Sequence, residues 1–154
     1  MRVFSSRMFL SVVVSGFVLA MAGPVHAQEK KVISTPDAPP AIGPYSQAIR
    51  AGKTVYLAGQ VSIDPKTKQF VNGTIEEQTK MALDNLKAVL AADGLTMDHV
   101  VSTGVFLKDL NEFGKMNGVY GTYFKNAPPA RATVEVARLP LDARVEISAI
   151  AVHP

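Results

Sequence analysis

Arg131 and Glu146, near the end of the chain, are the side chains whose types and positions suit a functional site. Arg131 lies in PPARATVEV (128–136), where two prolines fix the backbone that enters a strand. A guanidinium is a planar donor that fits a carboxylate, so Arg131 is a candidate to bind a small organic acid. Glu146 lies in RVEISAIAV (144–152) and is the second candidate.

Arg131 also has a plainer interpretation, as a surface arginine. It then pairs with a carboxylate such as Glu135, or packs its stem on apolar surface while its head stays in water. If the strands of Arg131 and Glu146 form a hairpin, Glu135 lies opposite Glu146, and Arg131 lies roughly 13 Å away along the strand. One small ligand then cannot contact both side chains in one chain, so a shared site requires a neighbouring subunit.

Most other catalytic centres lack their residues in this sequence. There is no cysteine, which excludes thiol catalysis and a cysteine-based zinc site. The three histidines, His26, His99 and His153, lack the paired spacing of a zinc site, so we expect no metal. Neither a GxSxG nucleophile motif nor a glycine-rich phosphate loop occurs.

The first 27 residues have the pattern of an export signal. Arg2 and Arg7 precede the apolar run MFLSVVVSGFVLAMAG, and the small residue Ala27 suits cleavage before Gln28. The run is short for a spanning helix. We therefore expect a periplasmic or secreted protein without stable membrane association.

Residues 28–154 are expected to form one domain with little net charge. The predicted signal holds two of the 16 basic residues and none of the 13 acidic ones, which leaves a net charge of +1. Nucleic-acid-binding proteins usually carry a clustered basic face, so we expect no nucleic-acid partner. Without disulfides, the domain depends on its core, or on its core and subunit contacts.

Hydrophobic periodicity and turn residues predict the element order β-β-α-β-α-β-β. A capping box at Thr74 and Glu77 opens the first helix, and Asp109 with Glu112 repeats the signal for the second. The predicted elements are a hairpin within 47–64, a helix over 74–93, a strand over 100–107, a helix over 109–124, and strands over 131–137 and 144–152.

This order predicts an α+β fold, with one mixed sheet and two helices packed on one face. The other face of the sheet also carries apolar side chains, and monomers rarely leave such a patch exposed. We therefore expect the chain to associate through that bare face.

Six segments, in this order and at these spacings, resemble the RidA family (YjgF/YER057c/UK114): IGPYSQAI, LAGQVSID, LDNLKAVL, VFLKDLNEF, PPARATVEVARLP and VEISAIAV. The resemblance implies a chorismate-mutase-like fold, assembled as a homotrimer with pockets at the subunit interfaces. It implies hydrolysis of reactive enamine and imine acids, such as 2-iminobutanoate and 2-iminopropanoate, to 2-oxo acids and ammonia. No metal or organic cofactor takes part in that reaction.

By position, the resemblance also assigns site residues. Arg131 matches the arginine that pairs with the substrate carboxylate, and Glu146 matches the carboxylate associated with the hydrolytic water. Tyr45 and Asn117 match pocket positions, and Gly59 matches the backbone close to the ligand.

The chain departs from many bacterial relatives at two positions. Ala58 replaces a serine, and Thr133 replaces a cysteine; Thr133 is expected to share the face of Arg131 and is a further candidate contact with substrate. Two other functions stay open, namely a non-catalytic exported binder of small carboxylates and a chaperone-like holdase. Ribonuclease activity, attributed to relatives, is disfavoured by the low charge and the lack of a histidine pair.

Overall fold

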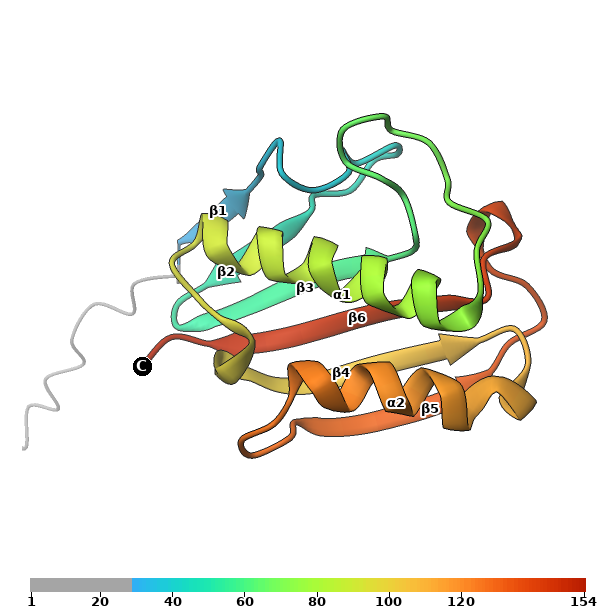
Figure 1. Cartoon of the computed structure of the whole chain (residues 1–154). Helices are drawn as coiled ribbons and strands as arrows, with labels where there is room; N and C mark the ends of the chain where they lie inside the picture. The colour runs from blue at the N-terminus through green and yellow to red at the C-terminus, as the bar shows by residue number, and fades with distance from the viewer. Residues whose placement is uncertain (1–28) are drawn as a thin grey trace, which may run out of the picture.

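Six strands form one mixed sheet, and both helices cover the same face of it (Figure 1). The computed structural model describes residues 29–154, so the predicted export signal over 1–27 lies outside the described residues. The elements are β1 (Lys30–Ile33), β2 (Ala48–Ala51), β3 (Thr54–Gln60), α1 (Ile75–Ala92), β4 (Val100–Leu107), α2 (Phe113–Tyr123), β5 (Ala130–Glu135) and β6 (Val145–Val152). None of the helices described here has the length and apolar character needed to cross a membrane.

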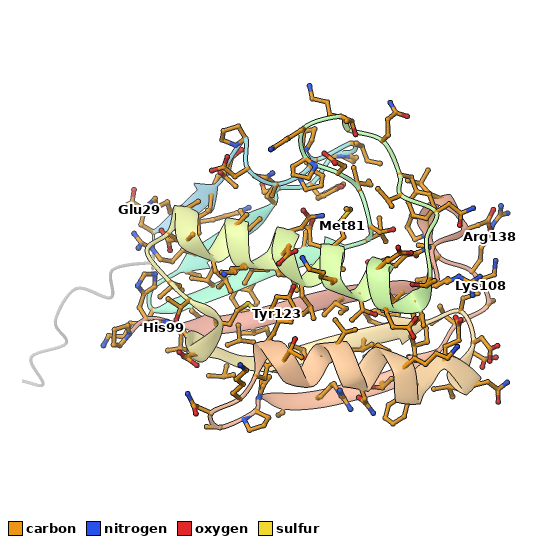
Figure 2. All side chains as sticks on the ribbon, viewed as in Figure 1. Glu29, Met81, His99, Lys108, Tyr123 and Arg138 are labelled. Atoms are coloured by element: carbon orange, nitrogen blue, oxygen red, sulfur yellow. The ribbon has the colours of Figure 1, made fainter. Side chains whose placement is uncertain are left out.

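The strands lie in the order β1-β2-β3-β6-β4-β5, and every neighbouring pair is antiparallel except β4 and β5. The predicted α+β sheet with two helices on one face is therefore confirmed. β1 is an additional edge strand that the predicted order leaves out. The side chains of Lys108 and Arg138 mark one end of the sheet, and His99 marks the other (Figure 2).

α1 begins and ends where its capping signals predict. The Thr74 hydroxyl accepts a hydrogen bond from the Glu77 amide at 3.3 Å, and the Glu77 carboxylate accepts one from the Thr74 amide at 2.7 Å. The chain leaves the helix through Gly94, whose φ of +74° favours glycine. Leu83 and Leu86, on the apolar face of α1, are fully buried in the core between the helices and the sheet.

α2 crosses from β4 to β5, which makes these two strands parallel. Asp109 forms the predicted cap, but of a short 3-10 turn, Leu110–Glu112, that precedes the helix. Its carboxylate accepts a hydrogen bond from the Asn111 amide at 2.8 Å. Met116 and Tyr120 are the buried residues of α2 and join the same core as α1.

The hairpin considered for the last two strands does not form, because β4 lies between β5 and β6 and pairs with both. The crossover through α2 places β5 beside β4, since a β-α-β connection joins parallel strands. β6 takes a central position because every second side chain from Val145 to Ala151 is buried, whereas β5 buries none of its residues. Glu146 therefore lies opposite Phe106 and not opposite Glu135.

The face of the sheet away from the helices carries apolar side chains. Tyr56 pairs with Ile150, and Val134 pairs with Phe106, in adjacent strands. Tyr56 is 51% exposed and Val134 is 45% exposed. These four side chains define what we call the open face. Its apolar character agrees with the sequence, and its association with another chain stays a prediction.

Asp93 forms a buried ionic cluster at the C-terminal end of α1. Its carboxylate lies 2.8 Å from Nε2 of His153, 3.1 Å from Nζ of Lys31 and 3.4 Å from Nη1 of Arg50. Burial raises the pKa of Asp93, but hydrogen bonds from His153 and Lys31 and the charge of Arg50 outweigh it, leaving the pKa below its ordinary value of 3.8. A carboxylate at this end opposes the helix dipole, and the two cations offset that cost.

Replacing Asp93 by asparagine should lower the free energy of unfolding at pH 7 by roughly 1–3 kcal/mol, because Lys31, Arg50 and His153 lose the buried anion that they share. A depressed pKa stabilises the fold above the unfolded-state value, and this contribution is lost as the pH falls through the folded-state value. Urea unfolding should therefore show the deficit shrinking below about pH 4. Asp98→Asn, at a nearby exposed carboxylate, is the control and should show no such deficit. A deficit that persists in strong acid would contradict the ionic role.

Candidate active site

Arg131 lies on the helix-covered face of β5, next to α2. It pairs in register with Thr103, whose side chain is buried beneath the helices. Nη1 of Arg131 donates a hydrogen bond to Oδ1 of Asn117 at 2.8 Å, and the guanidinium carbon lies 4.6 Å from the centre of the Tyr120 ring. The ring centre of Phe113 lies 5.5 Å from the same carbon. These three residues of α2 recur at i, i+4 and i+7, so one face of the helix holds the guanidinium.

A cleft of about 440 Å³ opens at this guanidinium, and we call it the arginine cleft. It is lined by Asn117, Tyr120, Gly121, Phe124, Pro128, Pro129 and Arg131. The two prolines form part of the wall of this cleft. Their rings also fix the backbone just before β5.

No ion pair among residues 29–154 includes Arg131. Glu135, the partner in the plainer interpretation, accepts a hydrogen bond from the Leu110 amide at 2.9 Å instead. Burial raises the pKa of Tyr120, although its hydrogen bond to Thr103 and the charge of Arg131 act in the opposite direction, so the phenol stays neutral. The guanidinium is therefore a held cation without a counter-ion in the described chain, which suits an anionic ligand.

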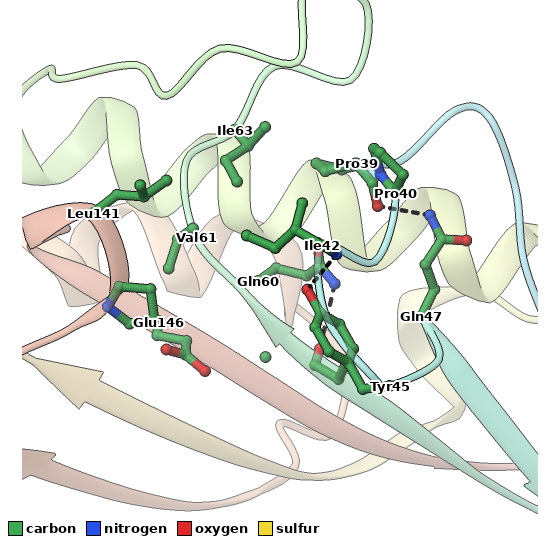
Figure 3. A pocket seen from close by; sticks show the side chains of 13 residues that line it. Pro39, Pro40, Ile42, Tyr45, Gln47, Gln60, Val61, Ile63, Leu141 and Glu146 are labelled. Atoms are coloured by element: carbon green, nitrogen blue, oxygen red, sulfur yellow. Dashed lines mark hydrogen bonds between the residues drawn. The ribbon is translucent and has the colours of Figure 1, made fainter.

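Glu146 lies on the opposite face of the sheet, near its centre. Its neighbours Val145 and Ile147 are fully buried beneath the helices, so strand alternation points Glu146 toward the other side. It lines a second cleft of about 370 Å³, together with Tyr45 and Gly59, and we call this the glutamate cleft (Figure 3). Burial raises the pKa of Glu146.

The Glu146 carboxylate lies against the backbone of Gly59. A Cβ added at Gly59 would overlap Oε1 of Glu146 and would lie 2.8 Å from its Cδ. The pairing of β3 with β6 is also irregular between Leu57 and Gln60, where the strand bulges. Glycine at this position therefore allows the close approach, and Ala58 beside it lines the same cleft.

Tyr45 stands on a loop that the buried side chain of Gln47 holds in place. The Gln47 amide donates to the Pro39 carbonyl at 2.7 Å, and its oxygen accepts from the Thr35 amide at 2.7 Å. The Tyr45 hydroxyl accepts a hydrogen bond from the Ile42 amide at 3.4 Å. No sequence pattern marks Gln47, and the structure adds it as a residue that positions the loop.

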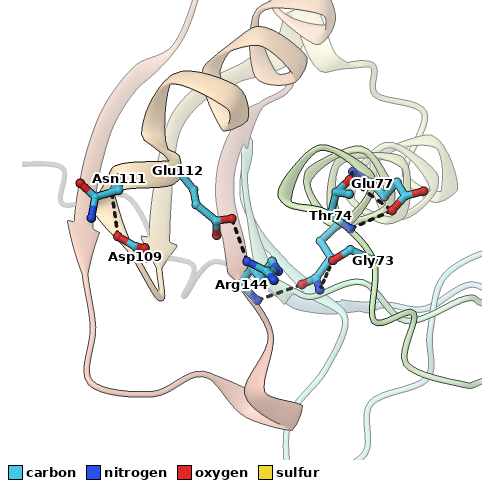
Figure 4. Close-up of polar contacts among 8 residues, drawn as sticks. Gly73, Thr74, Glu77, Asp109, Asn111, Glu112 and Arg144 are labelled. Carbon is cyan, nitrogen blue, oxygen red and sulfur yellow. Dashed lines mark hydrogen bonds and ion pairs between the residues drawn. The ribbon is translucent and has the colours of Figure 1, made fainter.

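Side chains from α1 and from the 3-10 turn before α2 hold the backbone that leads into β6 (Figure 4). Oε1 of Gln78, on α1, accepts a hydrogen bond from the Arg144 amide at 2.9 Å. Glu112 pairs with the Arg144 guanidinium at 2.8 Å. Asn85, also on α1, donates to the carbonyl of Ile63, which lines the glutamate cleft, at 3.0 Å. Buried amides of α1 therefore hold the backbone of Ile63 and of Arg144, two residues before Glu146.

Thr133 is the predicted site residue that lines neither cleft. It shares the face of Arg131 and pairs in register with Val105. Its Oγ1 is buried and has no hydrogen-bond partner within residues 29–154. Buried hydroxyls normally have a partner, so this group is free to bind one, but its contact with substrate stays a prediction.

The other predicted site residues fall into two groups. Arg131 and Asn117 line the arginine cleft, whereas Tyr45, Gly59 and Glu146 line the glutamate cleft. The register separates Arg131 from Glu146 by about 10 Å along the strands and about 10 Å across them. They also face opposite sides of the sheet. One small ligand therefore cannot contact both groups within one chain.

The histidines of the described chain have structural contacts. Nε2 of His153 lies 2.8 Å from the Asp93 carboxylate, and Nδ1 of His99 accepts a hydrogen bond from the Thr96 amide at 3.0 Å. Within residues 29–154, no group of three or more His, Asp or Glu side chains is arranged to hold a metal ion.

Proteins similar to this chain include named deaminases. A mouse protein named 2-iminobutanoate/2-iminopropanoate deaminase is 52% identical over 124 residues, which cover 80% of this chain and 92% of the relative. A RutC family protein of Pyrococcus horikoshii is 53% identical over 122 residues, which cover 79% of this chain and 97% of the relative.

Solved structures of the same fold agree with these relatives. The YjgF gene product of E. coli is 44% identical, with a TM-score of 0.77 over 80% of this chain and 99% of its own. A putative endoribonuclease of Thermotoga maritima is 46% identical, with a TM-score of 0.79 over 80% of this chain and 98% of its own. The family pattern described as Endoribonuclease L-PSP matches residues 35–153. The chain therefore belongs to the endoribonuclease L-PSP family, which is the RidA family that its motifs indicate.

Proposed function

We propose that the protein hydrolyses reactive 2-imino and enamine acids to 2-oxo acids and ammonia. The observation that carries the proposal is a pair of charged groups with no ion-pair partner within residues 29–154, Arg131 in one cleft and Glu146 in the other. Relatives named 2-iminobutanoate/2-iminopropanoate deaminase, at 52% identity in mouse and 46% in human, support the same reaction.

Arg131 binds the substrate carboxylate in this mechanism. Its guanidinium is oriented by Asn117 and by the Tyr120 ring before any ligand arrives, so little rotational freedom is lost on binding. A paired guanidinium and carboxylate fixes both the position and the plane of the acid. The adjacent C=N carbon is thereby held at a defined place.

Glu146 activates the water. As the water oxygen attacks the C=N carbon, the π electrons of that bond move to nitrogen, and Glu146 accepts the proton that the water releases. The same carboxyl group then returns the proton to nitrogen. The C–N bond breaks as the hydroxyl oxygen forms the carbonyl of the 2-oxo acid, and the hydroxyl proton passes through the Glu146 carboxylate to the departing ammonia. Positioning supplies much of the rate, because a protonated imine is already electrophilic.

The two halves of the site come from neighbouring chains. The arginine cleft lies at the edge strand β5, and the glutamate cleft lies on the other face of the sheet, so two different surfaces must meet. Repeated contacts between unlike surfaces form a ring when the rotation from chain to chain closes. A ring of three chains, as the resemblance implies, holds three such sites and also covers the apolar open face.

A non-catalytic binder of small carboxylates would use the same arginine. It would bind 2-oxo acids through Arg131 but would need no water beside Glu146. Turnover of fresh imine, compared with binding of the oxo acid alone, therefore separates the two functions.

Arg131→Ala should reduce kcat/KM for 2-iminopropanoate about 100-fold or more, because the carboxylate loses its clamp. Arg131→Lys should retain part of the activity, since lysine keeps the charge but not the planar pair of donors. The decay of imine produced by an amino-acid oxidase gives the rates. Lys115→Ala, an exposed cation of α2, is the control. Wild-type rates in Arg131→Ala would end the clamp mechanism.

Glu146→Gln should lower kcat about 100-fold or more and leave KM nearly unchanged, because the amide cannot accept the proton. Burial raises the pKa of Glu146 above its ordinary value of 4.5, and the base must be ionised. The wild-type kcat/KM, corrected for spontaneous hydrolysis, should therefore fall as the pH drops through a value above 4.5. A profile that is flat down to pH 4.5, or an active Glu146→Gln, would remove Glu146 from the mechanism.

Mixing the two inactive variants should restore activity. When Arg131→Ala and Glu146→Gln chains assemble together at random, about a quarter of the interface sites receive an intact arginine from one chain and an intact glutamate from the other. The co-expressed mixture should thus show about a quarter of the wild-type activity, while each variant alone shows almost none. A mixture as inactive as its parents would contradict the shared site.

A further inference from the structure

The glutamate cleft is larger than the smallest 2-imino acids need. Its volume is about 370 Å³. That is the volume of about twelve water molecules at about 30 Å³ each in the liquid, whereas 2-iminopropanoate has six non-hydrogen atoms and places its carboxylate at Arg131. The remaining volume is available to a longer side chain.

The additional space has an apolar wall. Ile42 is 72% exposed and Leu141 is 53% exposed, and both line the cleft. In Figure 3 these two side chains lie with Val61 and Ile63 on one side of Glu146. Ile42 and Leu141 come from different loops, so two separate parts of the chain each present an aliphatic group to the same cleft. Exposed aliphatic side chains gathered around one hollow indicate an apolar ligand.

The backbone presents Leu141 in an unfavourable conformation. Leu141 has φ 57° and ψ 22°, in the left-handed region that side chains rarely adopt, and Asp142 follows with φ 54°. Asp142 pairs with Arg138 through two contacts of 2.8 and 3.1 Å, and its amide donates to the Leu139 carbonyl at 3.1 Å. The turn is thus held although glycine or asparagine would fit it more easily, which points to a use for the leucine side chain.

The charge of the glutamate cleft also limits which substrate side chains it accepts. Among residues 29–154, Glu146 is the one charged side chain that lines this cleft, and no lysine or arginine does. An acidic substrate side chain would meet that carboxylate without a balancing cation, so such substrates are disfavoured.

We infer that Leu141 and Ile42 make the enzyme selective for 2-imino acids with large aliphatic or aromatic side chains. The inference rests on the proposed imine hydrolysis and names the substrate class of that site. The substrate carboxylate binds Arg131 of one chain, and the side chain lies between Leu141 and Ile42 of the next.

The test compares imines made in place by an L-amino-acid oxidase from alanine, leucine, methionine and phenylalanine. The kcat/KM for the leucine- and methionine-derived imines should exceed that for the alanine-derived imine about ten-fold or more, because additional methylene groups are buried. Leu141→Asn, which suits the left-handed backbone, should lower the ratio of leucine- to alanine-derived kcat/KM several-fold. Ile42→Asn provides a second variant on the other rim and should act in the same direction.

Leu110→Asn is the matched control, since this leucine is 44% exposed and lines neither cleft. Its ratio should equal that of the wild type. Hydrolysis of all four imines at equal kcat/KM, or ratios unchanged in both rim variants, would overturn the selectivity and leave the proposed reaction standing. Absence of turnover on every imine, including the alanine-derived one, would overturn the reaction itself.

Discussion

Successive residues of a β-strand face opposite sides of the sheet, and this alternation decides how the candidate site can work. It places Arg131 beneath α2 with Asn117 and Tyr120, and it places Glu146 on the uncovered side. No rearrangement of side chains can move either group to the other face without shifting a strand by one residue. The backbone thus places the two charged groups on opposite faces of one chain, and in the proposed site a neighbouring chain supplies the missing half.

Rigid support surrounds each half of the site. On one side, α2 offers an amide oxygen and a neutral ring to the guanidinium at fixed helical spacing. On the other, the buried amides Gln47, Gln78 and Asn85 bind the backbone of the loops and turn around the glutamate cleft. A buried amide that satisfies backbone groups is costly to move, so these hydrogen bonds restrain the loops. The buried amide side chains are thus located where they fix the backbone around the glutamate cleft.

Local signals in the sequence predicted the elements well. The capping box at Thr74 and the strand over 100–107 depend on neighbouring residues, and the structure places both as expected. The pairing of strands depends on distant residues: β5 and β6 follow one another along the chain, which allows a hairpin, yet β4 separates them. The positions of hydrophobic residues along a strand do not determine which strand lies beside it.

The site could be predicted in part. Arg131, with its two preceding prolines, stood out because a charge at a strand start needs an explanation, and Gly59 followed from the resemblance. Tyr120 was not among the predicted site residues, although its spacing from Asn117 places both beside Arg131. Gln47 gave no signal, because a polar residue before a strand has no distinguishing pattern and its partners lie in a loop without periodicity.

The left-handed backbone at Leu141 affects which substitutions are favoured at this position during evolution. A residue that tolerates this conformation, such as glycine, would relieve a cost of about 1–2 kcal/mol. Variants chosen for resistance to heat would therefore tend to lose this leucine, and those chosen for discrimination among ligands would keep it. Selection for thermal stability and selection for ligand discrimination therefore favour different residues at position 141.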